Sequence, residues 1–303
     1  MANSRSVNAA IGELLLAAVF WGFGFIATVW ALQKIDAFEL TLLRFVIASC
    51  VGLPFVLLYG RGVMLRYWRL SLWPSVLLVG NLLFQTWGME YTTPTKSGFI
   101  TTLYVVLVPL LEARMTGRPL GRVIWVCVGL ALLGTALIVD LGYSPINIGD
   151  VLTMICTLFA AVQIYWMGQI SGKIERPFVF NAFQCFWAVP LAFPFVHLST
   201  LHAKLAQCAV WPPTVWAGII SLSLGSTVLA FFLQVRSQSK LSATVSSLIF
   251  LLESPLALMF AVVLLGQSLN ALESVGAALI FFSAFMATWI EGREKKLLLV
   301  ENL

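Results

Sequence analysis

The chain has 303 residues, of which 60% are hydrophobic and only 10% are charged, and its net charge is +5. With so few charged side chains and a mean hydropathy of +0.95, the chain cannot cover the surface of a soluble globule. Its basic residues lie mainly in the loops between apolar stretches, as in membrane proteins. We therefore expect an integral membrane protein with no nucleic-acid partner and no soluble domain.

Charged residues, glycines and prolines divide the chain into ten apolar stretches. Each is close to the roughly 20 residues that a helix needs to cross a bilayer, so we predict an all-α membrane protein with ten transmembrane helices. The first stretch is too long for a signal-peptide core and is expected to be retained. The predicted spans are 11–32, 38–59, 72–91, 96–113, 122–140, 150–170, 178–197, 213–236, 241–264 and 272–290.

The distribution of Lys and Arg predicts the orientation, because cytoplasmic loops collect these residues. With a cytoplasmic N-terminus, only Lys34, Lys96 and Lys204 fall outside, and Arg44 lies within a span. Both termini are therefore expected in the cytoplasm. We expect a multi-pass protein of the cell membrane, in bacteria the inner membrane.

Motifs of enzymes and metal proteins are missing from the sequence. Four of the five cysteines lie within predicted spans, and none forms a CxxC pair. Phosphate-binding loops and nucleophile triads are also absent. We expect no metal, no cofactor and no enzymatic activity.

The second half of the chain repeats the first in outline. Residues 90–100 and 108–111 correspond to residues 237–244 and 254–257, and Pro109 with Pro255 sets an offset of about 146 residues. Because each copy holds five spans, an odd number, the second copy enters the membrane from the opposite face. We predict two inverted five-helix repeats, residues 1–141 and 142–303.

Inverted repeats favour a transporter, because two similar bundles can rock and expose one midplane site to each side in turn. The alternative is a duplication that merely enlarges a stable bundle. That alternative predicts no polar groups in the middle of the membrane.

The order and spacing of several short motifs resemble the ten-helix EamA-type branch of the drug/metabolite transporter superfamily. This resemblance implies inverted five-plus-five topology and a central cavity lined mainly by spans one, three, four, six, eight and nine. One departure is Gly117-Arg118 and Gly266-Gln267, where family members often carry Gly-Glu, so no role of that glutamate is transferred. The motifs are Phe20-Trp21-Gly22, Leu42-Leu43-Arg44-Phe45, Tyr91-Thr92-Thr93, Pro109, Pro255, Gly129 and Gly276.

Glu253 is the strongest candidate for a functional residue, because it lies at the centre of the ninth span. An intramembrane carboxylate costs roughly 2.5–3.5 kcal/mol on insertion scales and usually faces a watery cavity. Glu253 could balance a cationic substrate or carry a proton for coupling. The alternative is a structural role, either an ion pair with Arg44 or a protonated acid bonded to a neighbouring helix.

Aromatic and amide side chains on other spans could complete a substrate site with Glu253. Aromatic faces attract cations, and Tyr104 corresponds to Phe250 by the repeat offset. Ordinary packing between helices explains the same residues equally well. Besides Glu253, the candidate substrate-binding residues are Tyr104, Phe250, Trp21, Phe25, Gln163, Tyr165, Asn81 and Ser247.

Two prolines and one arginine have several interpretations. Pro109 and Pro255 could be paired hinges, since proline removes a helical hydrogen bond, or they could be tolerated kinks. Arg44 lies about two turns into the second span, where its long side chain could reach the interface. Anion recognition and pairing with Glu253 are the alternatives.

These features together predict a secondary active transporter that works by alternating access. The expected substrate is a small organic metabolite, amino acid-like or a cationic amine, with protons coupled through Glu253. A passive channel or a non-transporting scaffold is the alternative. The expected partners are the substrate, the lipid bilayer and protons, and the protein is a monomer or a homodimer.

Overall fold

The computed structural model describes the whole chain except residues 1, 118, 139–145, 267 and 302–303. Throughout this described part, the regular secondary structure is helical and includes no strand. Eight helical segments of it are long and apolar enough to cross a membrane. They are Val7–Ala31, Ala37–Leu57, Lys96–Thr116, Ile148–Lys173, Pro177–Phe195, Pro213–Ser237, Ala243–Leu264 and Ala271–Arg293.

The helices follow the predicted stretches closely in both halves of the chain. The first half holds α1 (Ala2–Ala31), α2 (Ala37–Leu57), α3 (Arg61–Gly88), α4 (Pro94–Thr102), α5 (Tyr104–Thr116) and α6 (Arg122–Ile138). The second half holds α7 (Ile148–Ile170), α8 (Pro177–Ala192), α9 (Leu198–Leu205), α10 (Pro213–Ile220), η4 (Ser221–Ala230), α11 (Phe231–Ser237), α12 (Ala243–Phe250), α13 (Glu253–Leu265) and α14 (Ala271–Glu301). The connections between α7 and α10 also contain short 3-10 turns. These are η1 (Ser171–Lys173), η2 (Phe193–Phe195) and η3 (Cys208–Val210).

Two of the ten predicted spans are not among the eight apolar segments. The span predicted at 122–140 corresponds to α6, which has only 17 residues. The span predicted at 72–91 corresponds to the second part of α3, whose first turns carry Arg61, Arg66 and Arg69. A total of ten crossings requires that these two helices also span the membrane. Ten crossings therefore remain a prediction.

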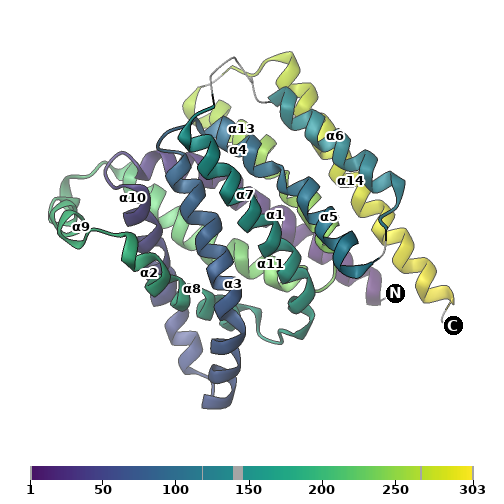
Figure 1. Cartoon of the computed structure of the whole chain (residues 1–303), viewed down its shortest axis with the longest axis horizontal. Coiled ribbons are helices and arrows are strands. Elements are labelled where there is room, and N and C mark those ends of the chain that lie inside the picture. The colour runs from purple at the N-terminus through teal and green to yellow at the C-terminus, as the bar shows by residue number, and fades with distance from the viewer. Residues whose placement is uncertain (1, 118, 139–145, 267, 302–303) are drawn as a thin grey trace.

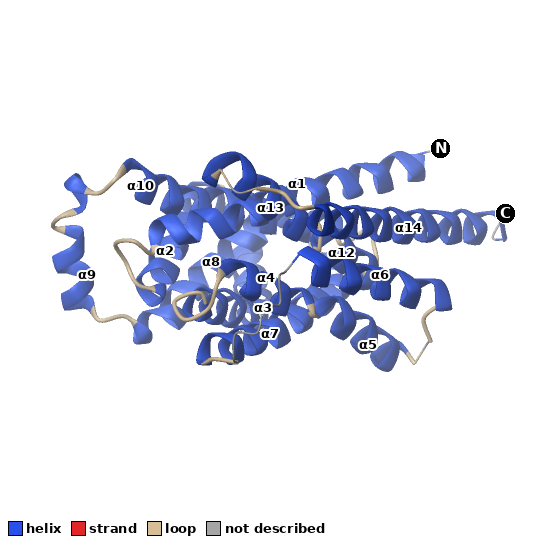
Figure 2. Cartoon of the chain, turned by 90° about the horizontal axis from the view of Figure 1, so that it is seen from above, coloured by secondary structure: helices blue, strands red, loops and turns tan. Residues whose placement is uncertain are grey.

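Both termini lie at one end of the bundle, and α9 lies at the opposite end (Figures 1 and 2). We call the end that holds α9 the Lys204 end and the opposite end, where α11 finishes, the Arg236 end. α1 runs through the middle and packs against α10, η4 and α13. α3 packs against α7 and α8, and α6 and α14 lie side by side at the edge.

Two predicted spans are interrupted instead of continuous. The span at 96–113 divides into α4 and α5 at Leu103, and the span at 241–264 divides into α12 and α13 at Leu251 and Leu252. Pro255 explains the second break, because it has no N–H for the carbonyl of Leu251 and its ring clashes with that carbonyl. As a result, Glu253 is the first residue of a helix rather than the middle of one.

The segment from α10 to α11 contains a third irregularity, the π-helix η4. Side chains from other helices bind its carbonyl groups. Trp21 Nε1 donates to the carbonyl of Ser226 at 3.2 Å, and Asn181 Nδ2 donates to the carbonyls of Thr227 and Val228 at 3.2 and 3.1 Å. π-helical turns occur often at functional sites, and this one faces α1, α2 and α8.

Glycine allows the edge helices α6 and α14 to touch through their backbones. A Cβ atom on Gly276 would lie 2.4 Å from the carbonyl oxygen of Gly134, which no real contact permits. The helices of the fifth and tenth predicted spans therefore pack closely. Gly129, in contrast, has nothing within 4 Å of such an atom.

A partly buried ion pair fastens α9 to the start of α2 at the Lys204 end. Lys204 Nζ lies 2.6 Å from Glu39 Oε2 and 3.2 Å from Asp36 Oδ2, and the Glu39 side chain is only 1% exposed. Partial burial alone lowers the pKa of Lys204, but hydrogen bonds to Glu39 and Asp36 raise it above the ordinary value of 10.5. The sequence predicted only a loop between His197 and Trp211, because the pairing partners are far away in the chain.

Lys204→Met is expected to destabilise the fold by about 1–2 kcal/mol, because Glu39 stays buried without its cation while Lys204 itself is partly solvated. The folded pKa of Lys204 lies above its unfolded value, so this contribution is complete below pH 10.5 and is lost as the pH rises further. Unfolding in mixed micelles measures the change. Lys34→Met, at an exposed neighbouring position, is the control, and equal stability of both variants would contradict the prediction.

Candidate functional site

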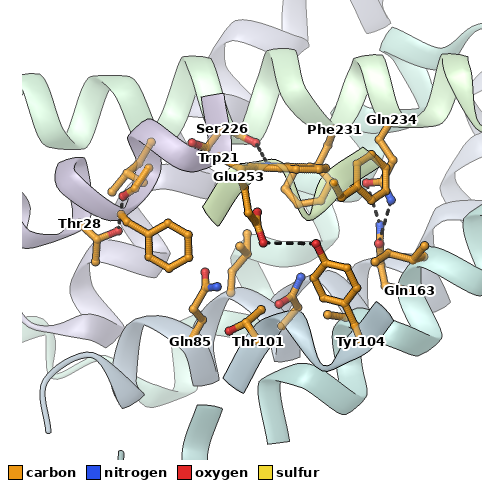
Figure 3. Close-up of a pocket in the computed structure, with 18 of the residues that line it drawn as sticks. Trp21, Thr28, Gln85, Thr101, Tyr104, Gln163, Ser226, Phe231, Gln234 and Glu253 are labelled. Carbon is orange, nitrogen blue, oxygen red and sulfur yellow. Dashed lines mark hydrogen bonds between the residues drawn. The ribbon is translucent and has the colours of Figure 1, made fainter. Parts of the chain in front are cut away.

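A small polar cavity lies at the centre of the helix bundle (Figure 3). Its volume is about 70 Å³, and its walls come from α1, α2, α3, α4, α5, α7, η4, α11, α12 and α13. Polar side chains on these walls are Thr28, Arg44, Asn81, Gln85, Thr101, Tyr104, Gln163, Ser226, Gln234 and Glu253. The cavity therefore joins both halves of the chain around one carboxylate.

Glu253 and Tyr104 face each other across the cavity, as Figure 3 shows. Glu253 is 8% exposed, and the Tyr104 hydroxyl donates a hydrogen bond to its Oε1 atom at 3.4 Å. Each residue is the first of a helix that follows a break, Tyr104 in α5 and Glu253 in α13. The positive end of the α13 dipole favours a carboxylate at this position.

Glu253 has no cationic partner in the described part of the protein. The ion pairs found there involve Glu175, Asp150, Asp36, Glu39 and Glu13. The alternative of a Glu253–Arg44 ion pair is therefore wrong for this conformation. The carboxylate is available to a ligand or a proton.

Aromatic rings form the wall beside Glu253. The Trp21 ring lies 5.0 Å from that of Phe250 in an edge-to-face arrangement and 5.1 Å from that of Phe231. Trp21 is held in place because its indole N–H binds the carbonyl of Ser226 in η4. These rings and Phe25 all line the cavity, so they can pack against an apolar or cationic part of a solute.

Two glutamines close the cavity on the side of the Arg236 end. Gln163 Nε2 donates to Gln234 Oε1 at 3.3 Å, and Gln234 Nε2 donates back to Gln163 Oε1 at 3.0 Å (Figure 3). Their exposed fractions are 2% and 1%. Because α11 ends three residues after Gln234, this reciprocal amide pair separates the cavity from that end of the protein.

Replacing either Gln163 or Gln234 by Met is expected to cost about 1–3 kcal/mol, because the remaining buried amide loses its partner. The double replacement should cost clearly less than the sum of the two single changes. A double-mutant cycle on the free energy of unfolding in micelles measures this coupling. Strictly additive losses would show that the two amides do not depend on each other.

Seven predicted substrate contacts line this cavity, namely Glu253, Tyr104, Phe250, Trp21, Phe25, Gln163 and Asn81. Tyr165 and Ser247 do not. Tyr165 packs into an apolar cluster, because residues two apart on a helix point to opposite sides and Gln163 takes the cavity side. Ser247 is fully buried and donates to the carbonyl of Thr244 at 2.7 Å.

Other cavity residues were missed as substrate contacts. Gln234 and Thr101 occupy the cavity-facing side of their helices, but nothing in a sequence distinguishes them from helix-packing polar residues. Arg44 was expected to reach the interface. It is instead 3% exposed and lines the cavity, so that expectation is wrong.

Matching charged contacts close the two ends of the bundle. At the Lys204 end, Asp150 Oδ2 lies 2.6 Å from Lys96 Nζ, and Thr92 donates to Asp150 Oδ1 at 2.8 Å. At the Arg236 end, Glu13 Oε1 lies 3.2 Å from Arg236 Nε, and Ser237 donates to Glu13 Oε2 at 2.6 Å. Each contact joins the first helix of one half to the other half, Asp150 in α7 to Lys96 in α4 and Glu13 in α1 to Arg236 in α11.

Several sequence expectations fall on residues that the structure does not describe. Arg118 and Gln267, which replace the family's glutamates, are among them, as is the boundary predicted between residues 141 and 142. Among the described residues, no group of three or more His, Cys, Asp or Glu side chains is placed to hold a metal ion.

Comparison with known proteins agrees with this architecture. The EamA-like transporter family matches the chain twice, over residues 9–140 and 147–289. An uncharacterized transporter of Archaeoglobus fulgidus is 29% identical over 282 residues, which are 91% of this chain and 84% of that protein. A protein of known crystal structure, 18% identical, has the same fold with a TM-score of 0.72 over 94% of this chain and 98% of its own.

These matches confirm the resemblance that the short motifs indicated and cover nearly all of the described helices. Together with the eight apolar segments, they establish a multi-pass membrane protein. This chain therefore belongs to the EamA-like transporter family and is a membrane transporter.

Proposed function

We propose that the protein is a secondary active transporter that carries a small organic metabolite by alternating access through the central cavity. The substrate is amino acid-like or a cationic amine, and protons are coupled to its movement through Glu253. The observation that carries this proposal is the cavity itself, which places one unpaired carboxylate among aromatic and amide side chains in mid-bundle. An intramembrane acid in such a setting ordinarily has a transport role.

The way in which the two halves pair supports the proposal of inverted repeats. The family match falls in two copies, and the fourth predicted span of each copy contains a break, before Tyr104 in the first and before Glu253 in the second. The Asp150–Lys96 and Glu13–Arg236 contacts lie at opposite ends, and each involves the acidic residue near the start of the first predicted span of one half. Such pairs support a mechanism in which each end opens while the other stays closed.

The distribution of basic residues supports a cytoplasmic Arg236 end and an external Lys204 end, with both termini inside the cell. The cell membrane, in bacteria the inner membrane, is the proposed location. Pro109 and Pro255 are proposed hinges, since each lies within about two turns of a helix break. We propose no chemical conversion of the substrate.

The cavity is small in the conformation described here. A cavity of about 70 Å³ holds a few water molecules, whereas sites for organic ligands measure roughly 300–1,000 Å³. A second hollow of about 500 Å³ lies at the Lys204 end, and Met89 lines both spaces. Movement of α3 near Met89 would join them and open the site to the outside.

Proton coupling through Glu253 requires that substrate and proton compete for the carboxylate. Binding of a cationic group favours the ionised acid and releases its proton, and protonation on the other side releases the substrate. The neighbouring Tyr104 hydroxyl can donate to the ionised form and so supports either occupant.

Purified protein in liposomes with an imposed pH difference tests this function. Amino acids and simple amines are supplied as radiolabelled probes, and protein-free liposomes are the control. We expect one of these solutes to accumulate above its external concentration and the accumulation to collapse when the pH difference is removed. A channel would bring the solute only to equal concentrations, and a scaffold would move none, so either result would contradict the proposal.

A further inference from the structure

Arg44 is a buried cation in the wall of the central cavity. It lies on α2, is 3% exposed, and lines the same space as Glu253. Its Nε atom donates to Thr227 Oγ1 at 2.9 Å, and its Nη2 atom donates to the carbonyl of Leu222 at 3.5 Å. Both partners belong to the π-helix η4.

The guanidinium group is only partly satisfied by these partners. It has five N–H donors, of which the two hydrogen bonds use two, and the second bond is long. In the described part of the protein Arg44 belongs to no ion pair. No carboxylate of the described residues therefore lies close enough to balance its charge.

Holding a helix in place does not explain a charge at this position. Asn181 from α8 binds two carbonyl groups of the same π-helix, those of Thr227 and Val228, with a neutral amide. A neutral side chain could do the same at position 44 without the cost of burying a charge. The positive charge therefore points to a ligand.

We propose that Arg44 is a substrate-binding residue that holds an anionic group, a carboxylate, of the transported solute. The planar guanidinium matches a carboxylate with two parallel hydrogen bonds, which a lysine or an amide cannot reproduce. Glu253 in the same cavity then receives the cationic group. The substrate is consequently amphoteric, and a simple amine without an anionic group is a poor one.

This inference rests on the proposed transport function. Of the two substrate classes proposed there, it selects the amino acid-like solutes over the simple amines. Neutral amides from Asn81 and Gln85 line the same cavity as Arg44 and Glu253. They can bind polar groups of the solute without adding charge. The total charge of solute and site together is then zero, as a low-dielectric setting requires.

Binding to matched ligands tests the role of Arg44. The probes are the proteinogenic amino acids, and for each one its amide, which lacks the carboxylate, and its decarboxylated amine. Isothermal calorimetry measures their affinities for the purified full-length protein. We expect an amino acid to bind at least about tenfold more tightly than its amide. Arg44→Gln should remove that preference, lowering the affinity for the amino acid about 10- to 100-fold while the affinity for the amide stays unchanged.

Two further variants separate ligand binding from structural support. Thr227→Val removes a partner of Arg44 but leaves the guanidinium charge, so the preference for the amino acid should persist. Arg44→Lys keeps the charge without the planar fork and should restore part of the preference. These two variants carry the test if Arg44→Gln does not fold.

Several results would overturn the inference. One is that Arg44→Gln or Arg44→Lys weakens the binding of the amino acid and of its amide equally, which is what a structural role predicts. The amine could bind as well as the amino acid, or no amino acid could bind at all. If liposomes nevertheless accumulate an amine, the transport function stands and only the role of Arg44 fails, whereas absence of any accumulation contradicts the transport function itself.

Discussion

Glu253→Gln is expected to lower pH-driven accumulation of the transported solute at least about 30-fold while the protein remains folded. Gln keeps the shape and can still accept the hydrogen bond from Tyr104, but it can neither balance a cation nor carry a proton. Losing one partner of a desolvated charge pair costs about 2–5 kcal/mol, which corresponds to this loss or a larger one. Uptake into liposomes with an imposed pH difference measures the effect.

Glu175→Gln is the matched control, because it makes the same chemical change at a side chain that is 73% exposed and only pairs with Arg66 at the surface. Its transport should equal that of the unchanged protein. Both variants should elute as single species and unfold at similar temperatures. If Glu253→Gln transports as well as Glu175→Gln, then Glu253 is not the coupling residue.

Gly22→Ala is expected to damage both stability and transport, because α1 meets the broken helix at this glycine. A Cβ atom on Gly22 would lie 2.8 Å from the carbonyl oxygen of Glu253 and 2.9 Å from Leu256 Cβ. The added methyl group has to push α1 away from α13. Such overpacking costs about 1–3 kcal/mol, and it shifts the backbone of Glu253, the carboxylate of the proposed mechanism.

Gly12→Ala on the same helix is the control, since a Cβ atom there would have nothing within 4 Å. Alanine favours helix more than glycine, so this variant should be as stable as the parent or more so. Thermal unfolding in detergent and solute uptake are measured for both variants. Equal behaviour of Gly22→Ala and Gly12→Ala would show that close contact between α1 and α13 is not required.

Apolar length and repetition predicted most of the fold. Bilayer thickness sets the length of a spanning helix, and the observed helices begin and end within a few residues of the predicted spans in most cases. Pro255 also indicated a deviation from regular helix within its span. The exact form of that deviation, a complete break before Glu253, depends on packing against α1 and α5 that a sequence does not display.

The irregular helical segments are the main difference between the structure and the sequence prediction. The π-helix η4 exists because Trp21, Arg44 and Asn181 supply partners for its carbonyl groups, and these residues are far from it in the chain. Helix α9 was not predicted for a similar reason, since its attachment depends on the ion pairs of Lys204 with Glu39 and Asp36. Long-range partners of this kind carry no local sequence signal.

Unusual chemistry made some site residues easier to predict than others. A carboxylate in the centre of an apolar stretch is costly, so Glu253 was conspicuous. Tyr104 and Phe250 followed from the repeat offset, and both line the cavity. Arg44 was equally costly, but its position near the start of α2 favoured a role at the interface, and only the packing of α2 against η4 reveals that it is buried.

The central claim is that one cavity is reached from each side of the membrane in turn. Ser226→Cys tests it most directly in a chain whose native cysteines are replaced, because Ser226 lines the cavity and a thiol is close to a hydroxyl in size. A membrane-impermeant maleimide is applied to intact cells and to inverted vesicles, with and without the transported solute.

We predict that the new cysteine reacts from both sides and that the solute protects it. Any pH difference that increases labelling from one side should decrease labelling from the other. Labelling from only one side under every condition, or simultaneous increases from both sides, would contradict the account.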